Sequence, residues 1–374
     1  GPTTDKGVPM RAALLEIAGG PVTMIDDLEV AGPGPGQVTV EVEWCGLCHS
    51  DLSMLEGSHP APMPIVLGHE EDGRIPELGA DVTGIAVGDP VVVTPIPPCG
   101  RCYHCVRDQA SHCVNSASLL TNALPDGSTG LSRGGQSVYR GLGVGGFAER
   151  VLTTETGVVR VPDDVPLDVA SVVGCAVQTG LGAVFNTARV RPGDTVAVLG
   201  LGGIGMSIVA GARITGANRI VVSDPQRHRL DLASDFGATD FVDPSSEDVI
   251  ARVQAVTAGI GVDCAFEAVG SARVVETALA ATRNGGTTVL VGAGPIEETI
   301  ELSPTFFAIS GKRLMGCLLG GVNSLRDIPI IFELYRSGRL DLESLITDRR
   351  PLAELDRAAE AMKAGEGLRT LLSV

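Results

Sequence analysis

A glycine-rich turn between an apolar strand and an apolar helix constrains the fold of this 374-residue chain most strongly. Residues 195–199 read Thr-Val-Ala-Val-Leu, residues 200–205 read Gly-Leu-Gly-Gly-Ile-Gly, and residues 206–214 are apolar and helix-like. A further β-branched run, 219–223, ends directly before Asp224. This order of strand, glycine turn, helix and strand, closed by an acidic residue, predicts a dinucleotide-binding βαβ unit rather than a turn that binds nothing.

Each part of this fingerprint has a physical task. Gly200 permits the tight turn, Gly202 lets the backbone approach a pyrophosphate, and Gly205 lets the helix pack closely on the strand. The first helical turn, which includes Gly203 and Ile204, directs its free N–H groups at the phosphates. We therefore expect all five residues to contact the cofactor.

The acidic residue after the second strand indicates which nucleotide binds. Asp224 can accept hydrogen bonds from the adenosine ribose and would repel a 2′-phosphate, so NAD is favoured over NADP. Arg227 and Arg229 follow closely and leave NADP open as the alternative. We count Arg229 among the expected cofactor contacts.

The predicted pattern of secondary structure changes near residue 178. Before it, short β-rich runs such as 37–44 are interrupted by Gly and Pro, and residues 115–146, rich in Gly, Ser and Asn, are expected to form a long loop. After it, strand-like runs alternate with helical stretches, which predicts βαβ units and a buried parallel sheet. These runs are 195–199, 219–223, 263–266 and 288–291.

Four of the nine cysteines lie in one short segment, 99–113. Cys99, Cys102, Cys105 and Cys113 have the spacing Cys-x2-Cys-x2-Cys-x7-Cys, which lets one curled loop present four thiolates to a tetrahedral cation. Zinc suits such a donor set and keeps no open position, so we expect a structural zinc. An iron–sulfur cluster is the alternative, but the usual ferredoxin continuation is missing. His104 and His112 lie in the same loop as spare ligands.

Charge and hydropathy exclude several classes of partner. Lys and Arg number 28 against 45 for Asp and Glu, and a net charge of −17 disfavours nucleic acid. No apolar run has the length of about 20 residues that a membrane span needs, and no signal peptide is recognisable. We expect a cytoplasmic protein without a membrane partner, in which clustered thiols bind metal rather than form disulfides.

Several further motifs occur in an order that resembles one family from end to end. They are Gly46-Leu-Cys48-His49-Ser50-Asp51, Gly68-His69-Glu70, the four-cysteine segment, Gly174-Cys175, the glycine fingerprint and Leu368-Arg369-Thr370. In this order they resemble the zinc-dependent medium-chain alcohol dehydrogenases. The resemblance implies an α/β protein with a Rossmann doubly wound parallel sheet and a β-rich GroES-like catalytic domain.

The same resemblance implies the domain boundaries. Residues 1–177 would form the catalytic domain, with the structural zinc loop at 99–113. Residues 178–317 would form the NAD-binding domain, and residues 318–374 would return to the catalytic domain.

The resemblance also implies a second, catalytic zinc held by Cys48, His69 and Cys175. Two thiolates and one imidazole leave the fourth position that a catalytic zinc keeps for water or substrate. Asp51 would orient His69 by a hydrogen bond, and Glu70 would lie behind the metal. A haem attachment or redox pair at Cys45 and Cys48 is the less favoured interpretation.

Four other residues match functional positions of the family. Ser50 has the place of the hydroxyl that relays the substrate proton. His49 and Arg369 match positions that contact the cofactor pyrophosphate, and Thr179 matches a position near the nicotinamide.

The sequence departs from the family pattern at three places. Ser53 stands where a histidine often ends the proton path. The usually small and apolar stretch after His69-Glu70 reads Glu71-Asp72-Gly73-Arg74. Pro95 and Gly141 occupy positions that often carry aromatic side chains over the substrate, so we expect a wider pocket.

These features together predict reversible oxidation of an alcohol to an aldehyde or ketone, with hydride transfer to NAD and two zinc ions per subunit. A homodimer that pairs strands near 288–318 is expected by resemblance. Alternatives are a biosynthetic reductase of an aldehyde, imine or conjugated double bond, a thiol-adduct formaldehyde dehydrogenase and, less favoured, a non-catalytic NAD-binding protein.

Overall fold

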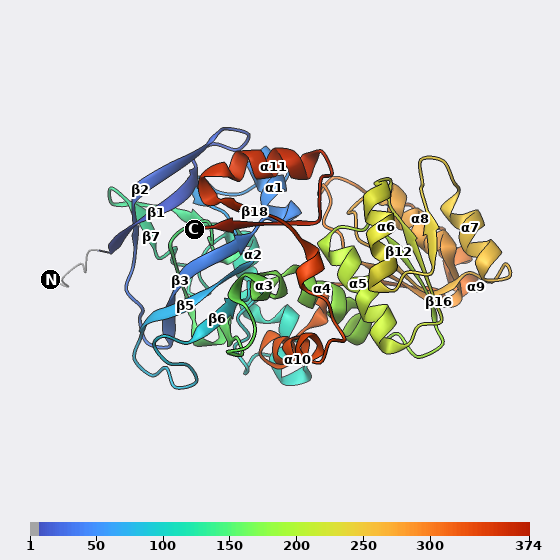
Figure 1. Cartoon of the computed structure of the whole chain (residues 1–374), viewed down its shortest axis with the longest axis horizontal. Coiled ribbons are helices and arrows are strands. Elements are labelled where there is room, and N and C mark those ends of the chain that lie inside the picture. The colour runs from blue at the N-terminus through green and yellow to red at the C-terminus, as the bar shows by residue number, and fades with distance from the viewer. Residues whose placement is uncertain (1–6) are drawn as a thin grey trace. The chain divides into compact units, whose positions relative to one another are not determined.

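The computed structural model of the chain describes residues 7–374 and contains two compact units (Figure 1). The first unit extends to Cys175 and resumes at Asn323–Val374, and the second is Ala176–Val322. The first six residues of the expected catalytic domain lie outside the described part.

The first unit is built on two mainly antiparallel sheets whose inner faces carry one large apolar core. Alternation of inward apolar and outward polar residues along β3 (Gln37–Gly46) matches a strand with one buried face. The first sheet has the order β8 (Gln136–Ser137), β7 (Leu131–Arg133), β2 (Val22–Val30), β1 (Val8–Leu15), β4 (Ile65–Val66) and β9 (Tyr139–Arg140). The second has the order β11 (Val158–Arg160), β6 (Pro90–Val93), β5 (Glu71–Leu78), β3, β19 (Arg369–Ser373) and β18 (Ile346–Pro351), with β10 (Arg150–Thr154) also paired to β3.

The long loop expected at 115–146 is wrong in part. This segment contains the short helix α2 (Ser118–Thr121), and three short strands, β7, β8 and β9, that extend the first sheet at both ends. Strands of two or three residues are too short to show a period-two pattern, and although β8 pairs with its neighbour β7, the partners of β7 and β9, which are β2 and β4, are distant in sequence. The sheet register, not local composition, therefore determines this segment.

The second unit is a six-stranded, fully parallel sheet. Its order is β14 (Asp240–Val242), β13 (Arg219–Ser223), β12 (Thr195–Leu199), β15 (Val262–Glu267), β16 (Thr282–Leu290) and β17 (Arg313–Gly316). Counted along the unit, this is the order 3-2-1-4-5-6 of the doubly wound dinucleotide-binding fold, so the predicted fold class is confirmed. The strand expected at 288–291 instead begins at Thr282 and ends at Leu290.

Helices connect the strands and cover the sheets. In the second unit they are α4 (Ala176–Gly182), α5 (Gly203–Thr215), α6 (Arg227–Phe236), α7 (Val249–Val256), α8 (Ala272–Ala281) and α9 (Pro304–Ser310). In the first unit, besides α2, they are α1 (His49–Glu56), α3 (Leu167–Ser171), α10 (Ser324–Arg336) and α11 (Leu355–Lys363). Within residues 7–374 no single helix has the length and apolar character to cross a bilayer. Two consecutive helical segments, Leu167–Gly174 and Ala176–Ala188, together have the necessary length and composition, but they are bent relative to each other by 53°.

One carboxylate joins three strands of the parallel sheet. Asp263 on β15 accepts hydrogen bonds from the Thr195 backbone N–H at 2.7 Å and from the Thr195 hydroxyl at 2.9 Å. Its other oxygen accepts from Arg283 Nε on β16 at 2.6 Å. Burial raises the pKa of Asp263, but the hydrogen bonds from Thr195 and Arg283 outweigh it and lower the pKa below its usual value. The ionised form therefore contributes to the stability of this sheet.

We predict that Asp263→Asn lowers the free energy of unfolding of the second unit by about 1–3 kcal/mol near pH 7, because hydrogen bonds to a charged acceptor are lost. A carboxylate with a lowered native pKa stabilises the fold above its unfolded pKa of about 3.9, and this contribution is lost as the pH falls through the native pKa. The difference between the wild type and the variant, measured by urea unfolding, should therefore shrink below about pH 4. Asp235→Asn, at an exposed position on α6, is the control. Equal losses in both variants would contradict the prediction.

Candidate metal centres and dinucleotide site

Cys48, His69 and Cys175 form one buried cluster in the first unit. Their ligand atoms all lie within 4.8 Å of one another, although the residues come from three separate segments. Cys48 precedes α1, His69 follows β4, and Cys175 follows a 3-10 turn after α3. Two sulfurs and one nitrogen are the donor set of a zinc site with an open fourth position, so these residues fit a catalytic zinc.

Asp51 fixes the geometry of this cluster. One carboxylate oxygen accepts hydrogen bonds from the Gly68 N–H and from His69 Nδ1, both at 3.0 Å, and the other accepts from the Cys48 N–H at 3.1 Å. Asp51 is at the third position of α1, so the bond to Cys48 also caps the helix N-terminus. Since Nδ1 donates to the carboxylate, Nε2 keeps its lone pair for a metal.

The charges around the cluster favour thiolate at Cys48. A hydrogen bond from Cys175 lowers the pKa of Cys48 well below its usual value, and Arg369 adds an attractive positive charge. Burial opposes protonation of His69, but Asp51 and Cys48 outweigh it and raise the pKa of the imidazole. The cluster thus combines a buried carboxylate, a thiolate and an imidazole, which a divalent cation would complement.

Arg369 and Glu70 line the same cluster. Arg369 is 3% exposed, and its guanidinium lies 3.6 Å from Glu70 Oε2 and 3.9 Å from Cys48 Sγ. It also donates to the Leu47 carbonyl at 3.1 Å. The contact of Arg369 with a cofactor pyrophosphate stays a prediction.

Ser50 and His49 begin α1, next to the cluster. Ser50 Oγ lies 3.9 Å from Cys48 Sγ, and the side chain of His49 is exposed. Ser53, one turn further, donates its hydroxyl to the His49 carbonyl at 2.9 Å. The Ser50 hydroxyl is therefore beside the Cys48 thiol, while the hydroxyl of Ser53 bonds to the helix backbone.

The acidic pair after His69-Glu70 has opposite orientations on β5. Glu71 lies beside Gly146, where an added Cβ would be 2.6 Å from its Oε2. Burial raises the pKa of Glu71 to about 8, while His69 and the fully buried Arg140 act in the opposite direction. Arg140, which the sequence analysis missed, donates to the carbonyls of Thr129 and Leu152 and places a positive charge within electrostatic reach of Glu71.

Asp72 follows on the other face of β5. Burial raises its pKa well above the usual value, and Glu43 adds repulsion. Arg74 is exposed and pairs with Glu43 at 3.2 Å. The positive charge of Arg140 thus offsets only part of the cost of burying Glu71, whose pKa still rises to about 8, and nothing in the structure explains the buried Asp72.

The wider pocket expected at Gly141 is wrong at that residue. An added Cβ at Gly141 would lie 2.9 Å from Leu67 Cα, so the backbone of the neighbouring segment already fills the space. Pro95 is likewise buried. Glycine at 141 permits this close approach and does not open a cavity.

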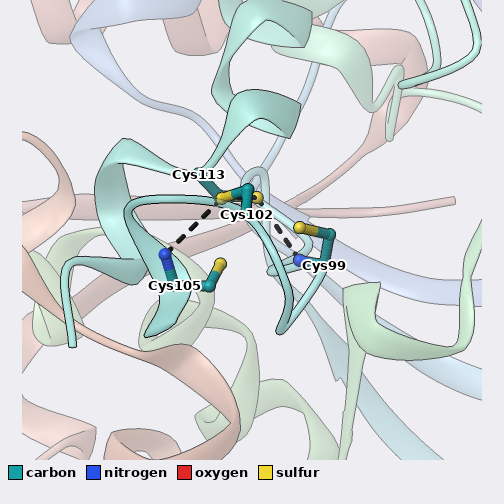
Figure 2. A group of neighbouring side chains, drawn as sticks. All are labelled: Cys99, Cys102, Cys105 and Cys113. Atoms are coloured by element: carbon teal, nitrogen blue, oxygen red, sulfur yellow. Dashed lines mark hydrogen bonds between the residues drawn. The ribbon is translucent and has the colours of Figure 1, made fainter. Parts of the chain in front are cut away.

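The four cysteines of segment 99–113 gather in one loop (Figure 2). Their sulfur atoms also lie within 4.8 Å of one another. Backbone N–H groups point at two of these sulfurs, with Cys99 N to Cys113 Sγ at 3.3 Å and Cys105 N to Cys102 Sγ at 3.5 Å. Hydrogen bonds from backbone N–H groups, of which that of Cys105 has the largest effect, lower the pKa of Cys102 to about 6. Four sulfurs with supporting N–H donors fit a structural zinc.

The remaining three cysteines lie outside both clusters. Cys45 and Cys264 are buried, and Cys317 contacts the Thr187 hydroxyl at 3.3 Å. All nine cysteines have free thiols, so Cys45 and Cys48 are not paired as a disulfide.

The glycine fingerprint forms the turn between β12 and α5. Gly200 has φ +96°, a conformation that glycine adopts without strain, and a Cβ at Gly205 would overlap the Gly200 carbonyl. Gly202 is the N-cap of α5 and has open space around it, and Gly203 and Ile204 form the first turn. The free N–H groups of this turn fit a pyrophosphate.

Asp224 follows β13 and is held by the same turn. Its carboxylate accepts hydrogen bonds from the N–H groups of Leu201 and Gln226, both at 2.8 Å, and Arg229 Nη1 lies 3.8 Å away. Each oxygen retains a further lone pair for a ribose hydroxyl. The residues fit the ribose of a dinucleotide, with the Arg229 guanidinium near the carboxylate.

Two residues that hold the turns of the candidate dinucleotide site were not predicted from the sequence. Leu201, a variable position of the fingerprint, supplies the backbone N–H to Asp224. Glu267 ends β15 and accepts from the N–H groups of Val269 and Gly270 at 2.8 and 2.7 Å, and a Cβ at Gly200 would meet the Val269 side chain. A backbone donor carries no sequence signal, but an acidic residue at the end of a buried strand could have been predicted. Thr179 is buried in α4 of the second unit.

The fold and the donor sets define a zinc-binding dehydrogenase, and comparison with known proteins gives the family. A model of the alcohol dehydrogenase GroES-like domain matches residues 34–163, and one of zinc-binding dehydrogenases matches residues 203–333. The chain therefore belongs to the zinc-dependent medium-chain alcohol dehydrogenase family, whose members are oxidoreductases.

Individual relatives match over almost their whole length. The chain is 38% identical to "Putative alcohol dehydrogenase D" of Mycobacterium tuberculosis, with 96% of this chain and 98% of that protein covered. It is 34% identical to an S-(hydroxymethyl)glutathione dehydrogenase of Synechocystis, with 97% and 99% covered. The crystal structure of benzyl alcohol dehydrogenase from Acinetobacter calcoaceticus superposes with a TM-score of 0.92 at 28% identity, covering 98% of this chain and 99% of the other.

Proposed function

We propose that the protein reversibly oxidises an alcohol to an aldehyde or ketone with NAD as the hydride acceptor. The observation that carries this proposal is the buried cluster of Cys48, His69 and Cys175 with the Ser50 hydroxyl 3.9 Å from Cys48 Sγ. A purely structural metal site would need neither an open position nor an adjacent proton carrier.

The two units have separate tasks in this proposal. In the first unit, Cys48, His69 and Cys175 hold a catalytic zinc and the four cysteines of segment 99–113 hold a structural zinc. In the second unit, the fingerprint turn and Asp224 hold NAD. When bound, zinc supplies Lewis-acid polarisation of the substrate oxygen and NAD supplies the hydride acceptor.

Protein residues carry the proton and orient the ligands. Ser50 accepts the proton of the substrate hydroxyl and passes it towards solvent. Asp51 keeps the His69 tautomer, and Arg369 pairs with Glu70 beside the cluster. Ser53 is a poor terminal base, so water or another group completes the proton path.

A pair of alanine variants tests the assignment of the two metal clusters. Cys48→Ala should lose one zinc per subunit and abolish turnover, because the catalytic donor set is broken, while NAD binding in the other unit stays intact. Cys102→Ala should also lose one zinc, but it should lower the thermal midpoint and leave turnover measurable at low temperature. Metal analysis, NAD titration and NADH absorbance with a panel of primary, secondary and aromatic alcohols distinguish these outcomes.

Cys45→Ala is the matched control, since this buried thiol lies outside both clusters. It should retain both zinc ions and turnover. Full activity of Cys48→Ala would refute zinc catalysis at this site, and no NADH from any alcohol with the fully loaded wild type would favour a reductase or a binding protein.

A thiol-adduct formaldehyde dehydrogenase is the second candidate. It is favoured by the relative named S-(hydroxymethyl)glutathione dehydrogenase. The same assay with formaldehyde and glutathione decides between the two, because this candidate requires NADH formation only when both are present.

The carboxylate of Asp224 supports NAD over NADP. We predict that Asp224→Asn shifts the ratio of kcat/KM for NAD to that for NADP at least tenfold towards NADP, since a neutral amide no longer repels a 2′-phosphate and Arg229 is released. The amide oxygen can still accept a backbone N–H, so the turn should persist. Asp235→Asn, at an exposed position on α6, is the control and should leave the ratio unchanged. An unchanged ratio in Asp224→Asn would overturn this role.

We further propose a homodimer formed through the outer edge of the parallel sheet. β17 is the last strand of the sheet, and α9 beside it in the chain has no buried residue. Phe306, Ile309 and Met315 are 76%, 77% and 37% exposed, an apolar edge that pairing around a two-fold axis would cover. Sedimentation velocity should give a dimer for the wild type and a monomer for Ile309→Asp, with Leu120→Asp as the exposed control. A monomeric wild type would refute the proposal.

A cytoplasmic location fits the free thiols, because a reducing compartment preserves them. Cell fractionation would test this expectation.

A further inference from the structure

His104 and His112 lie together on the four-cysteine loop but belong to neither thiol cluster. We propose that these two imidazoles form an additional, solvent-accessible site for a divalent cation such as Zn²⁺. The four sulfurs already complete a tetrahedral donor set, so the histidines are available for a separate ion. The inference does not depend on the proposed catalytic function, because it uses neither the Cys48 cluster nor the dinucleotide site.

The separation of the two rings suits a shared ion. Their centroids are 6.0 Å apart with an interplanar angle of 57°. A ring nitrogen binds zinc at about 2.0–2.1 Å, which places the ion roughly 3.2 Å from the ring centroid. Two imidazoles on one ion therefore have centroids about 5.2 Å apart at the tetrahedral angle and about 6.4 Å apart in a linear arrangement. The observed separation lies within this range.

Gln109 orients both histidines. Its side-chain oxygen lies 3.1 Å from His104 Nδ1, so Nδ1 carries the proton and Nε2 keeps the lone pair that a metal needs. The Gln109 N–H donates to the His104 carbonyl at 2.9 Å, and the His112 N–H donates to the Gln109 carbonyl at 2.9 Å. One residue thus fixes the tautomer of the first imidazole and the backbone spacing to the second, as outer hydrogen bonds do in metal sites.

The neighbouring charges are already engaged. Arg107 stacks on the Tyr103 ring at 3.7 Å from its centroid and donates to the Tyr103 carbonyl, so its guanidinium is held by that ring. Asp108 pairs through Oδ1 with Arg326 at 2.6 Å, which offsets its charge. Tyr103 contacts the edge of His104, with ring centroids 5.3 Å apart, which restricts rotation of that imidazole.

These surroundings determine the class of ion. Two neutral nitrogens suit Zn²⁺, Ni²⁺ or Cu²⁺ rather than Mg²⁺ or Ca²⁺, which prefer oxygen. Water would fill the remaining positions, so we expect binding that is weaker and more exchangeable than in the two thiolate clusters.

The test uses the zinc-loaded full-length protein. After exhaustive dialysis the tightly bound zinc is counted, and equilibrium dialysis against added Zn²⁺ then measures further binding. We expect one additional zinc per subunit in the wild type and at least a tenfold loss of affinity in His104→Gln and in His112→Gln. Gln109→Ala should weaken binding less, because the ligands remain but the tautomer is no longer fixed.

His228→Gln is the matched control, since this exposed histidine lies on α6 away from the loop. It should bind the additional zinc like the wild type. The proposal is overturned if the wild type binds no zinc beyond the tightly held ions or if both loop variants bind it unchanged. It is also overturned if either loop variant loses tightly bound zinc, which would make that histidine a ligand of the cysteine cluster.

Discussion

The buried Asp51 carboxylate is the interaction on which the candidate catalytic site depends. It accepts hydrogen bonds from three N–H groups, two on the backbone and one on His69, and thereby holds two ligand-bearing segments in one place. A carboxylate removed from water is costly unless its lone pairs are satisfied. Because these particular donors satisfy Asp51, the charge that orients His69 also fixes the N-terminus of α1 and the position of Cys48.

Carboxylates that bind backbone N–H groups recur in the second unit. Asp224 holds the fingerprint turn through Leu201, and Glu267 holds the turn after β15 that contacts Gly200. Asp263 joins the neighbouring strands through Thr195 and Arg283. The excess of acidic residues is therefore not only a surface property, since several of them shape the loops at the ends of the parallel strands.

Features with a local signal could be predicted from the sequence, and features set by distant pairing could not. The glycine turn and the four cysteines of the loop are each complete within a short segment, so spacing alone predicted how they come together. The grouping of Cys48, His69 and Cys175 spans over a hundred residues and was inferred from family resemblance. Arg140 beside Glu71 and the backbone of Leu67 against Gly141 depend on sheet register, which short strands do not reveal.

The discontinuous first unit has a consequence for how the chain matures on the ribosome. β19 pairs with β3 at Trp44, Cys45 and Gly46, and Arg369 bonds to the Leu47 carbonyl across 322 positions of the chain. The parallel sheet of the second unit is encoded entirely before this segment, so it can fold while the edge of β3 next to Cys48 still waits for its last neighbour. During synthesis, the sheet of the first unit is therefore completed only after β19 has been made. Until then, this edge of β3 has no partner strand and could pair with another chain.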